Sequence, residues 1–243
     1  MPWTHALDLQ KASVKDGTTD VAISKASKFV PFETLEHIKL GDAVIREVRR
    51  LLPYGSGNQK FDVGSWTATQ TDTQARGYLT QQLYQGNYGR AQHMAGAAVT
   101  FGSGTCQDQA AVAYLLLRER LPTTTTACFC YSDYSHHCYA AIGVPNTDPA
   151  DKVVIVDPWP KYPQALLWTD HFCYAHCGIY RQKPGVGQVG KLARAQAKYN
   201  NVNPVHQAIL SMYNHFGQPT WNHKWGNRKR GEVIVYHNDL ITF

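Results

Sequence analysis

The sequence predicts an α+β protein in which a central antiparallel sheet packs on one long helix. Residues 106–120, CQDQAAVAYLLLRER, contain an apolar run that a helix would place in a core. Three segments rich in β-branched and aromatic residues follow this helix, at residues 123–132, 134–144 and 152–160. An amphipathic pattern over residues 35–52 predicts a helix ahead of them. Consecutive strands preceded by helices are typical of an α+β fold.

The composition fits one globular domain without a membrane span. Of 243 residues, 43% are hydrophobic and 12% aromatic, which is enough for a sizeable core. The net charge of +6 is modest, so we expect no nucleic-acid partner. No apolar run is long enough to cross a bilayer, and the opening MPWTHALDLQ lacks the features of a signal peptide. We therefore expect a cytosolic protein whose six cysteines are reduced, or one delivered by a signal-independent secretion system.

The chain divides into an arm and one domain. Residues 1–30 are rich in Ser, Thr and Lys and predict a flexible N-terminal arm. Residues 31–243 predict a single domain, with a helical part over 31–99 and a core with the sheet over 100–243. Gly41 predicts an interruption or a fresh start in the first helix.

Further elements surround the predicted core. The first helix ends before Pro53, and a polar loop over 53–74 follows it. Residues 74–99 predict a broken helical region, or two shorter helices joined at Asn87. Later in the chain we expect two short helices and a strand that returns to an edge of the sheet, at residues 192–199, 204–216 and 232–237.

Turn residues predict how the three central strands pair. Ser132 and Asp133 predict a turn that makes the first two strands antiparallel. If the next hairpin has its tip at Thr147, then His137 and Asp157 are each ten residues from the tip and lie directly opposite one another. Their Cβ atoms would be about 5 Å apart. A carboxylate at that distance can fix the tautomer of an imidazole whose other nitrogen meets a thiol.

Cys106 has the surroundings of a reactive thiol. The preceding residues, Gly-Ser-Gly-Thr, form a small flexible turn, and the cysteine opens a helix. Unpaired N–H groups and the positive end of the helix dipole favour a thiolate at this position. Asp108 and the glutamines keep the first helical turn polar. A buried cysteine that acts as a small apolar side chain is the alternative.

Together these segments resemble the thiol enzymes of the papain and transglutaminase-core type. The strings are GTCQDQA, then His137-Cys138-Tyr139 at a strand start, then VIVDPW, and they span roughly residues 100 to 160. The resemblance implies Cys106 as nucleophile, His137 as base and Asp157 as the residue that orients the base. His136 is the rival base. Papain has a glutamine that holds the oxyanion where this chain has Thr100, so Gln92, Gln81 or Trp66 would take that role.

The resemblance also implies a function. Members of this group include cysteine proteases, glutamine deamidases and transglutaminases, several of them bacterial effectors or toxins. We therefore expect a papain/transglutaminase-like catalytic domain that forms an acyl-enzyme on amide groups of a protein substrate, without a metal or cofactor. The alternative is a non-catalytic binding module of the same fold. It would hold a protein or anionic partner through the basic aromatic turn at residues 223–232, with Trp221 and Trp225.

Two other motifs favour simpler explanations. The string GVGQVGK at residues 185–191 resembles a phosphate-binding loop, but Leu192 stands where a Ser or Thr should follow the lysine, so we expect a loop leading into a helix. His171, Cys173, His176 and Cys177 crowd together, yet no second ligand pair completes a zinc site. Cys173 with His171 is the second candidate for the nucleophile site.

Overall fold

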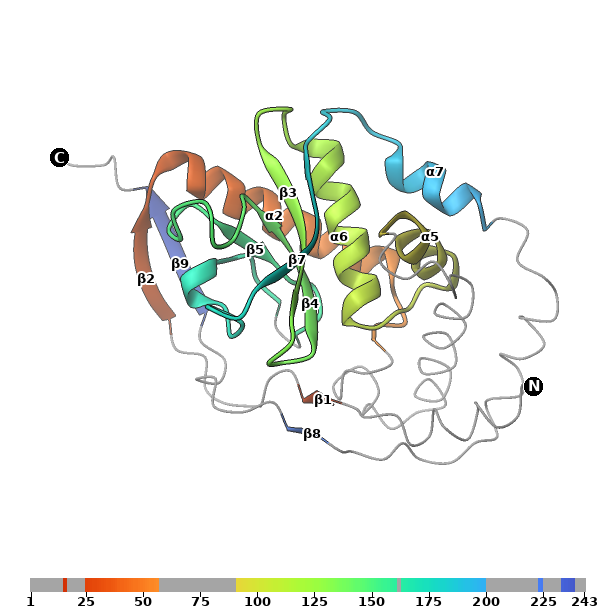
Figure 1. Ribbon diagram of the computed structural model, residues 1–243, viewed down its shortest axis with the longest axis horizontal. Coiled ribbons are helices and arrows are strands. Elements are labelled where there is room, and N and C mark those ends of the chain that lie inside the picture. Colours follow the sequence, from red (N-terminus) through yellow and green to blue (C-terminus); the bar gives the residue numbers. More distant parts are fainter. Residues whose placement is uncertain are drawn as a thin grey trace.

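The protein has an α+β fold built on a five-stranded antiparallel sheet (Figure 1). The computed structural model describes residues 15–16, 25–56, 91–160, 163–199, 223–224 and 233–238. The strand order is β6-β5-β4-β3-β7. The strands are β3 (Thr126–Ser132), β4 (His137–Ile142), β5 (Val154–Val156), β6 (Leu166–Leu167) and β7 (Gly178–Pro184). The three consecutive antiparallel strands predicted from the sequence, β3, β4 and β5, form its centre.

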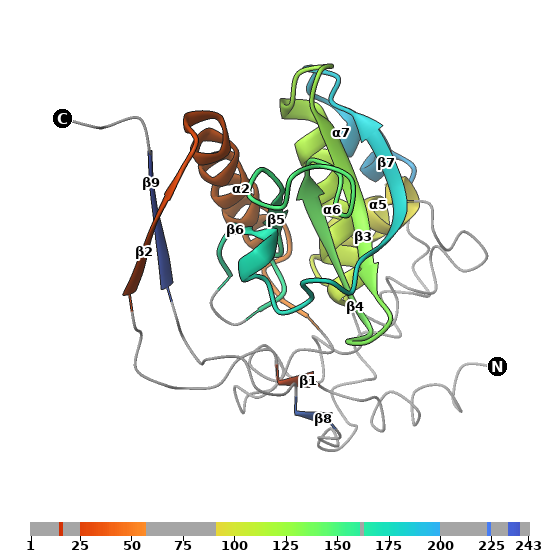
Figure 2. The same ribbon diagram turned by 60° about the vertical axis from the view of Figure 1, so that its left-hand side comes forward.

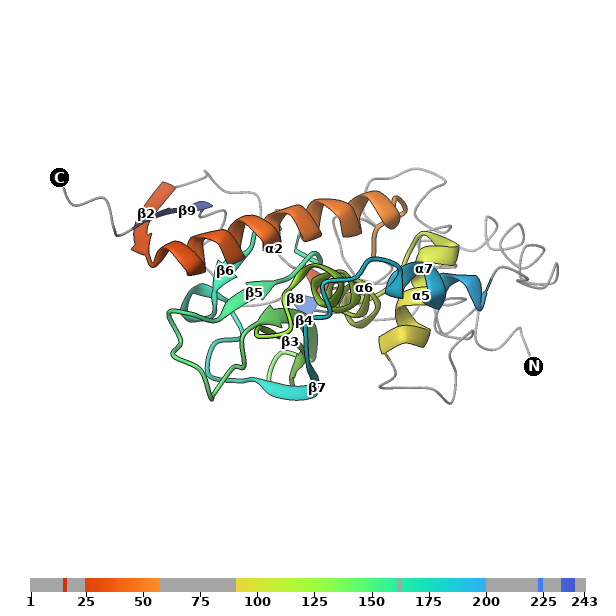
Figure 3. The same ribbon diagram turned by 90° about the horizontal axis from the view of Figure 1, so that it is seen from above.

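Helices cover one face of the sheet (Figures 2 and 3). They are α2 (Phe32–Leu51), α5 (Ala91–Phe101), α6 (Cys106–Arg120) and α7 (Lys191–Ala197). Helix α6 packs on β3 and β4, and α2 packs on β5. Helix α5 lies beside α6 and α7 lies on α5, so these two helices form an outer layer. The predicted start of a helix at Cys106 is confirmed.

Both faces of the central strands are buried. Val154 and Val156 belong to the core beneath α2 and α6, whereas Val153 and Ile155 pack into a second apolar cluster on the opposite face. A strand covered on both faces is what the run VVIV predicts. Each fully buried side chain of this kind contributes about 1.5–3 kcal/mol to the hydrophobic stabilisation of the fold.

Helix α2 runs without a break through Gly41 and ends before Pro53. The predicted interruption is therefore wrong, and the glycine has another cause. A Cβ at Gly41 would lie 2.7 Å from Ala165 Cβ and 3.0 Å from Val156 Cγ2. Glycine lets the helix axis approach the sheet at the point where β5 and the segment before β6 pass beneath it.

The β4–β5 pairing differs from the predicted register by two residues. Ala140 pairs with Val156 and Ile142 with Val154, so the ladder ends before His137 and Asp157. The prediction that these two residues are directly opposite is wrong. A shift of two residues leaves every side chain on its predicted face. His137 and Asp157 therefore still point to the same side of the sheet, as diagonal neighbours beyond the last ladder pair.

A second, two-stranded parallel sheet joins the two ends of the described chain. Strand β2 (Lys25–Val30) pairs along its whole length with β9 (Val233–Asn238), and the two strands stand side by side in Figure 2. The last part of the predicted flexible arm is thus a strand. The late strand exists as predicted, but its partner is β2 and not an edge of the central sheet.

This small sheet holds the segment that follows β6. The Tyr236 hydroxyl of β9 donates to Asp170 Oδ2 at 2.8 Å and accepts the Leu167 N–H at 3.1 Å. Lys28 of β2 forms an ion pair with the same Asp170. Asp170 closes the short 3-10 helix η1 (Trp168–Asp170). The residue that follows this helix, His171, is therefore fixed from both ends of the sequence.

Several predictions lie outside the described residues. They are the loop beyond residue 56, the helical region before residue 91, the helix over 204–216 and the basic turn beyond residue 224. Residues 15–16 (β1) and 223–224 (β8) form a further short parallel pair. Among the described helices, none has the length and hydropathy needed to cross a membrane.

Candidate active site

The turn before α6 is shaped by two glycines and closed by one carboxylate. Gly102 has a φ of +68°, which L side chains rarely adopt, and a Cβ at Gly104 would lie 2.4 Å from Asp108 Cβ. The Thr105 N–H and hydroxyl both donate to Asp108 Oδ2, at 2.7 and 2.9 Å. This carboxylate caps the start of α6 and stabilises it by about 1 kcal/mol. The arrangement makes Cys106 the first residue of the helix.

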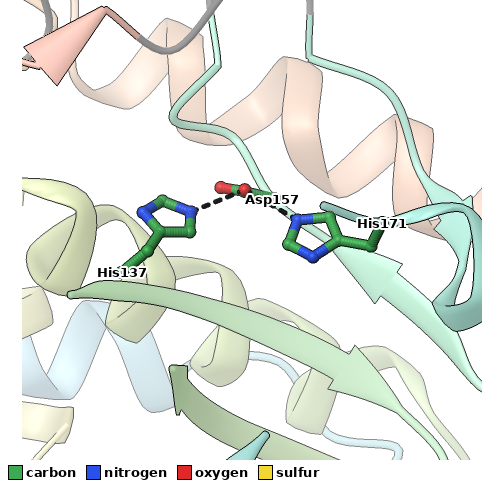
Figure 4. A group of neighbouring side chains, drawn as sticks. All are labelled: His137, Asp157 and His171. Carbon is green, nitrogen blue, oxygen red and sulfur yellow. Dashed lines mark hydrogen bonds and ion pairs between the residues drawn. The ribbon is translucent and has the colours of Figure 1, made fainter. Parts of the chain in front are cut away.

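His137 and Asp157 form a buried pair across the end of the sheet. His137 opens β4 and Asp157 follows the last residue of β5, and the two side chains are 0% and 3% exposed. His137 Nε2 lies 2.7 Å from Asp157 Oδ2, as Figure 4 shows. This is the length of a charge-assisted hydrogen bond. The sequence prediction that these two residues meet is confirmed by this contact, although the register that motivated it is not.

The Cys106 side chain reaches the same imidazole. Burial alone would lower the pKa of His137, but the charge of Asp157, the hydrogen bond to Asp157 and the nearby Cys106 raise it to about 9. Cys106 and His137 line the same cleft, and because Asp157 is bound to Nε2, Nδ1 is the ring nitrogen available to a thiol. The structure therefore brings Cys106, His137 and Asp157 together, with the histidine in the middle.

Asp157 accepts two further hydrogen bonds. The Trp159 N–H donates to Oδ1 at 3.1 Å, and His171 Nε2 lies 3.1 Å from Oδ2. Burial would raise the pKa of Asp157, but the His137 charge and the hydrogen bonds from His137 and His171 lower it below its ordinary value. A buried carboxylate with this many donors stays ionised.

A cleft of about 290 Å³ opens beside Cys106. Its lining combines the first turn of α6, the β3–β4 turn and one aromatic residue of β7, namely Thr105, Cys106, Gln107, Tyr131, Ser132, Asp133, His136, His137, Cys138 and Tyr180. Tyr131 stacks on Tyr180 at 4.2 Å between ring centroids, and its ring lies where a side chain on Gly178 would be. The stacked pair forms one aromatic wall of the cleft that Cys106 also lines.

His136, the rival base, also lines the cleft. It is exposed and adopts a φ of +45° in the β3–β4 turn. The Asp157 carboxylate contacts His137 and His171 instead. The geometry therefore pairs the orienting carboxylate with His137.

The predicted oxyanion donors do not meet Cys106 in the described residues. Gln92 is exposed at the start of α5 and does not line the cleft, while Gln81 and Trp66 lie outside the described residues. The Thr100 hydroxyl donates to Gly96 O at 2.8 Å. Gln107, which the sequence pattern did not single out as a donor, is the partly exposed amide beside the thiol.

Gln109, one of the glutamines expected to keep the first turn of α6 polar, lies in the interior, since the residue is 0% exposed. Neither polar atom of its amide finds a hydrogen-bond partner among the described residues.

The second candidate site has a different character. Cys173 is buried, and its Sγ lies 3.0 Å from Ser135 Oγ. Burial, opposed by the hydrogen bond from Ser135 and assisted by the charge of Asp157, raises the pKa of Cys173 to about 12. No helix begins at this cysteine, because it lies in the turns between η1 and β7. The second nucleophile hypothesis is therefore not supported by the geometry.

The crowded residues His171, Cys173, His176 and Cys177, from which no zinc site was expected, do not form one compact ligand group among the described residues. Within the described residues the one compact group of possible ligands is His137, Asp157 and His171, whose ligand atoms lie within 4.8 Å of one another. His176 is exposed and stacks on Tyr134 instead. The Cys173 N–H donates to His171 Nδ1 at 3.3 Å, which leaves the proton on Nε2. A protonated Nε2 donates a hydrogen bond and does not bind a metal, so the three residues form a hydrogen-bonded group.

The glycine-rich string 185–191 forms a loop that leads into α7, as predicted. A carboxylate of the protein already occupies the start of this helix, because Glu119 Oε1 accepts the Leu192 N–H at 2.6 Å. A Cβ at Gly185 would lie 2.1 Å from Leu121 O, so close packing explains this glycine. Charge repulsion by Glu119 opposes a phosphate there.

All six cysteines lie in the described residues, and no disulfide joins any of them. Comparisons with protein-family models, with curated proteins and with solved structures found no match to this chain. The chemistry of the protein must therefore be inferred from the geometry of the site itself.

Proposed function

We propose that the protein is a thiol enzyme that forms an acyl-enzyme on amide groups of other proteins. In this proposal Cys106 is the nucleophile, His137 the base and Asp157 the residue that orients the base. One observation carries it: the His137 ring is bound to a buried carboxylate and lines the same cleft as a cysteine that opens a helix. That sequence of groups is the arrangement that activates a thiol.

The first half of the reaction uses the Cys106 thiolate and the His137 imidazolium. Cys106, as a thiolate, attacks the carbonyl carbon of the substrate, and the C=O electron pair moves to oxygen. The N–H groups in the first turn of α6, with Gln107 beside them, are donors for this oxyanion. When the intermediate collapses, the C–N bond breaks and the His137 imidazolium gives its proton to the departing nitrogen. A thioester on Cys106 and an amine or ammonia result.

The second half restores the enzyme. A water molecule or a primary amine attacks the thioester, and neutral His137 accepts its proton. The C–S bond breaks, which returns the Cys106 thiolate and releases a carboxylic acid or a new amide. Protease, glutamine deamidase and transglutaminase activities share these steps and differ in the acceptor. Asp157 keeps the imidazole aligned throughout and stabilises its charged form in the steps where His137 holds the extra proton.

The fold is consistent with a papain/transglutaminase-like catalytic domain, since an antiparallel sheet packs on the helix that begins at the proposed nucleophile. The proposal that such a domain acts as a delivered effector or toxin rests on the sequence resemblance alone. The competing binding-module hypothesis depends on Trp221 and Trp225, which lie outside the described residues.

An activated ester tests acyl-enzyme formation without knowledge of the natural substrate. We expect p-nitrophenyl acetate to give a burst of one nitrophenolate per protein and an acetyl group on Cys106, located by peptide mass spectrometry. His137→Ala should lower the burst rate by about 10²-fold or more, whereas His136→Ala, the matched control at the adjacent cleft residue, should leave it nearly unchanged. Acetylation spread over several side chains without a burst would contradict the proposal.

A further inference from the structure

Asp157 carries a second histidine that the proposed mechanism does not use. In Figure 4, His171 lies on the side of the carboxylate away from His137, and both imidazoles are joined to it. The two rings bind the same oxygen, Oδ2, at 2.7 Å from His137 and 3.1 Å from His171. The three side chains are at most 3% exposed.

The backbone sets the tautomer of His171. Its Nδ1 accepts the Cys173 N–H at 3.3 Å, so Nδ1 holds a lone pair and Nε2 holds the proton. His171 is then a neutral donor to Asp157, whereas His137 is the charged one. The two bond lengths agree with this difference, because charge-assisted hydrogen bonds are shorter than neutral ones.

His171 has little freedom to move. Its N–H donates to Trp168 O at 3.1 Å, and its ring packs against Phe172 and Tyr139 at 4.4 and 4.8 Å between centroids. The preceding residue, Asp170, is held by Lys28 and Tyr236. A donor fixed in this way holds the carboxylate oxygen in place.

We propose that His171 is a positioning residue of the thiol site, which holds Asp157 ionised and keeps its Oδ2 aimed at His137. The inference rests on the proposed function, because it assigns a role in the same Cys106–His137 pair. Without the His171 donor, Oδ2 would keep the single bond to His137, and only this bond and the Trp159 N–H on Oδ1 would oppose rotation of the carboxylate about its Cβ–Cγ bond. A weaker hold on the imidazolium would then reduce the thiolate on Cys106.

Two substitutions separate positioning from packing. His171→Phe keeps an aromatic ring of similar shape but removes the donor. His171→Gln places an amide N–H near the position of Nε2 and keeps a donor. We expect iodoacetamide to alkylate Cys106 about tenfold more slowly at pH 6 in His171→Phe, and near the wild-type rate in His171→Gln. His176→Phe, in the same loop but exposed, is the matched control and should have no effect.

The titration of His137 gives a readout that packing alone would not move. Followed by NMR of its imidazole, the midpoint near 9 should fall toward the ordinary value in His171→Phe and stay in His171→Gln. In the wild-type protein the nitrogen shifts of His171 should report a ring whose Nδ1 carries no proton and whose Nε2 does. This last measurement tests the inference even if His171→Phe fails to fold.

Three results would overturn the inference: equal losses in the Phe and Gln variants, no loss in either, or a His171 ring protonated on Nδ1. Bound zinc in stoichiometric amount, released by His171→Phe, would also overturn it, because the residue would then be a ligand. His137→Ala in the same assay distinguishes a failure of the His171 inference from a failure of the proposed function. If Cys106 does not depend on His137, the proposed function itself fails; if it depends on His137 but not on His171, the function stands without this role.

Discussion

Two cysteine–histidine pairs share one aspartate in this protein, yet they are suited to different roles. Cys106 opens a helix, meets His137 and lines a cleft. Cys173 lies in a buried turn, where its backbone N–H donates to His171 and its thiol is hydrogen-bonded to the Ser135 hydroxyl. Burial raises the pKa of this thiol to about 12. A helix start, access to a cleft and a charged ring favour a reactive thiol, and in the proposed function only the Cys106 pair has all three.

Removing the charge that the two pairs share should have the largest effect. Asp157→Asn leaves the buried His137 without its anion, and breaking such a pair costs about 3 kcal/mol or more. We expect the free energy of unfolding, measured with urea, to fall by that amount, and Cys106 alkylation at pH 6 to slow by about 10²-fold. Cys173 alkylation should change much less. An equal change at both cysteines would mean that the aspartate acts only through the fold.

The stability of the protein should depend on pH in a defined direction. The His137 pKa rises from 6.5 in the unfolded chain to about 9 in the fold, so its contribution is complete below pH 6.5 and is lost as the pH rises through 9. The rise corresponds to about 3 kcal/mol. The Asp157 pKa is lowered, so its contribution is present above the unfolded value near 4 and is lost as the pH falls below it. Urea unfolding should show greatest stability between about pH 4 and 6.5 and no high-pH loss in Asp157→Asn.

The start of α6 gives a smaller effect that should be confined to one site. Gly104→Ala places a Cβ 2.4 Å from Asp108 Cβ, so the cap must shift. We expect a loss of about 1–3 kcal/mol in the free energy of unfolding and slower alkylation of Cys106. Cys173 should be unaffected, as read by peptide mass spectrometry under native conditions. Unchanged Cys106 reactivity would show that the helix start does not control the thiol.

The smallest effect is expected from Ser135→Ala, beside Cys173. The Ser135 hydroxyl lowers the pKa of Cys173, so Ser135→Ala should not make this thiol more reactive. We expect about 1 kcal/mol less stability in urea unfolding and no faster alkylation of Cys173. Faster alkylation would mean that the serine, and not burial, keeps Cys173 unreactive.

Local patterns predict much of the fold and the core of the site. The helix at Cys106 and strands β3, β4 and β5 follow from apolar runs and turn residues. The predicted His137–Asp157 contact exists although the predicted register is wrong, because a shift of two residues leaves each side chain on the same face of its strand. The two-residue shift in register arises in the connection over 143–153. There the Val144 N–H donates to Asp148 Oδ2 and Gly143 has a φ of +85°, so the turn is not centred on Thr147.

Local sequence patterns do not predict contacts between segments that are far apart in the chain. Strand β9 pairs with β2 about two hundred residues away, and no local signal specifies such a partner. His171 follows a strand of two residues and a short 3-10 helix, so no periodicity placed its ring on Asp157. The crowding of histidines and cysteines near it was visible in the sequence, but it led only to Cys173 as a second nucleophile candidate. The contacts of His171 with the Cys173 N–H and with Asp157 appear only in the structure.

The most direct test of the Cys106–His137 pair is the alkylation rate of each cysteine between about pH 5 and pH 9, in the wild type and in His137→Ala. We predict that Cys106 reacts far faster than the other five, that it remains reactive near pH 6, and that the substitution removes this advantage. If Cys106 instead reacts like Cys173 at every pH, or keeps its low-pH reactivity without His137, the ion pair does not exist and the thiol-enzyme account is contradicted.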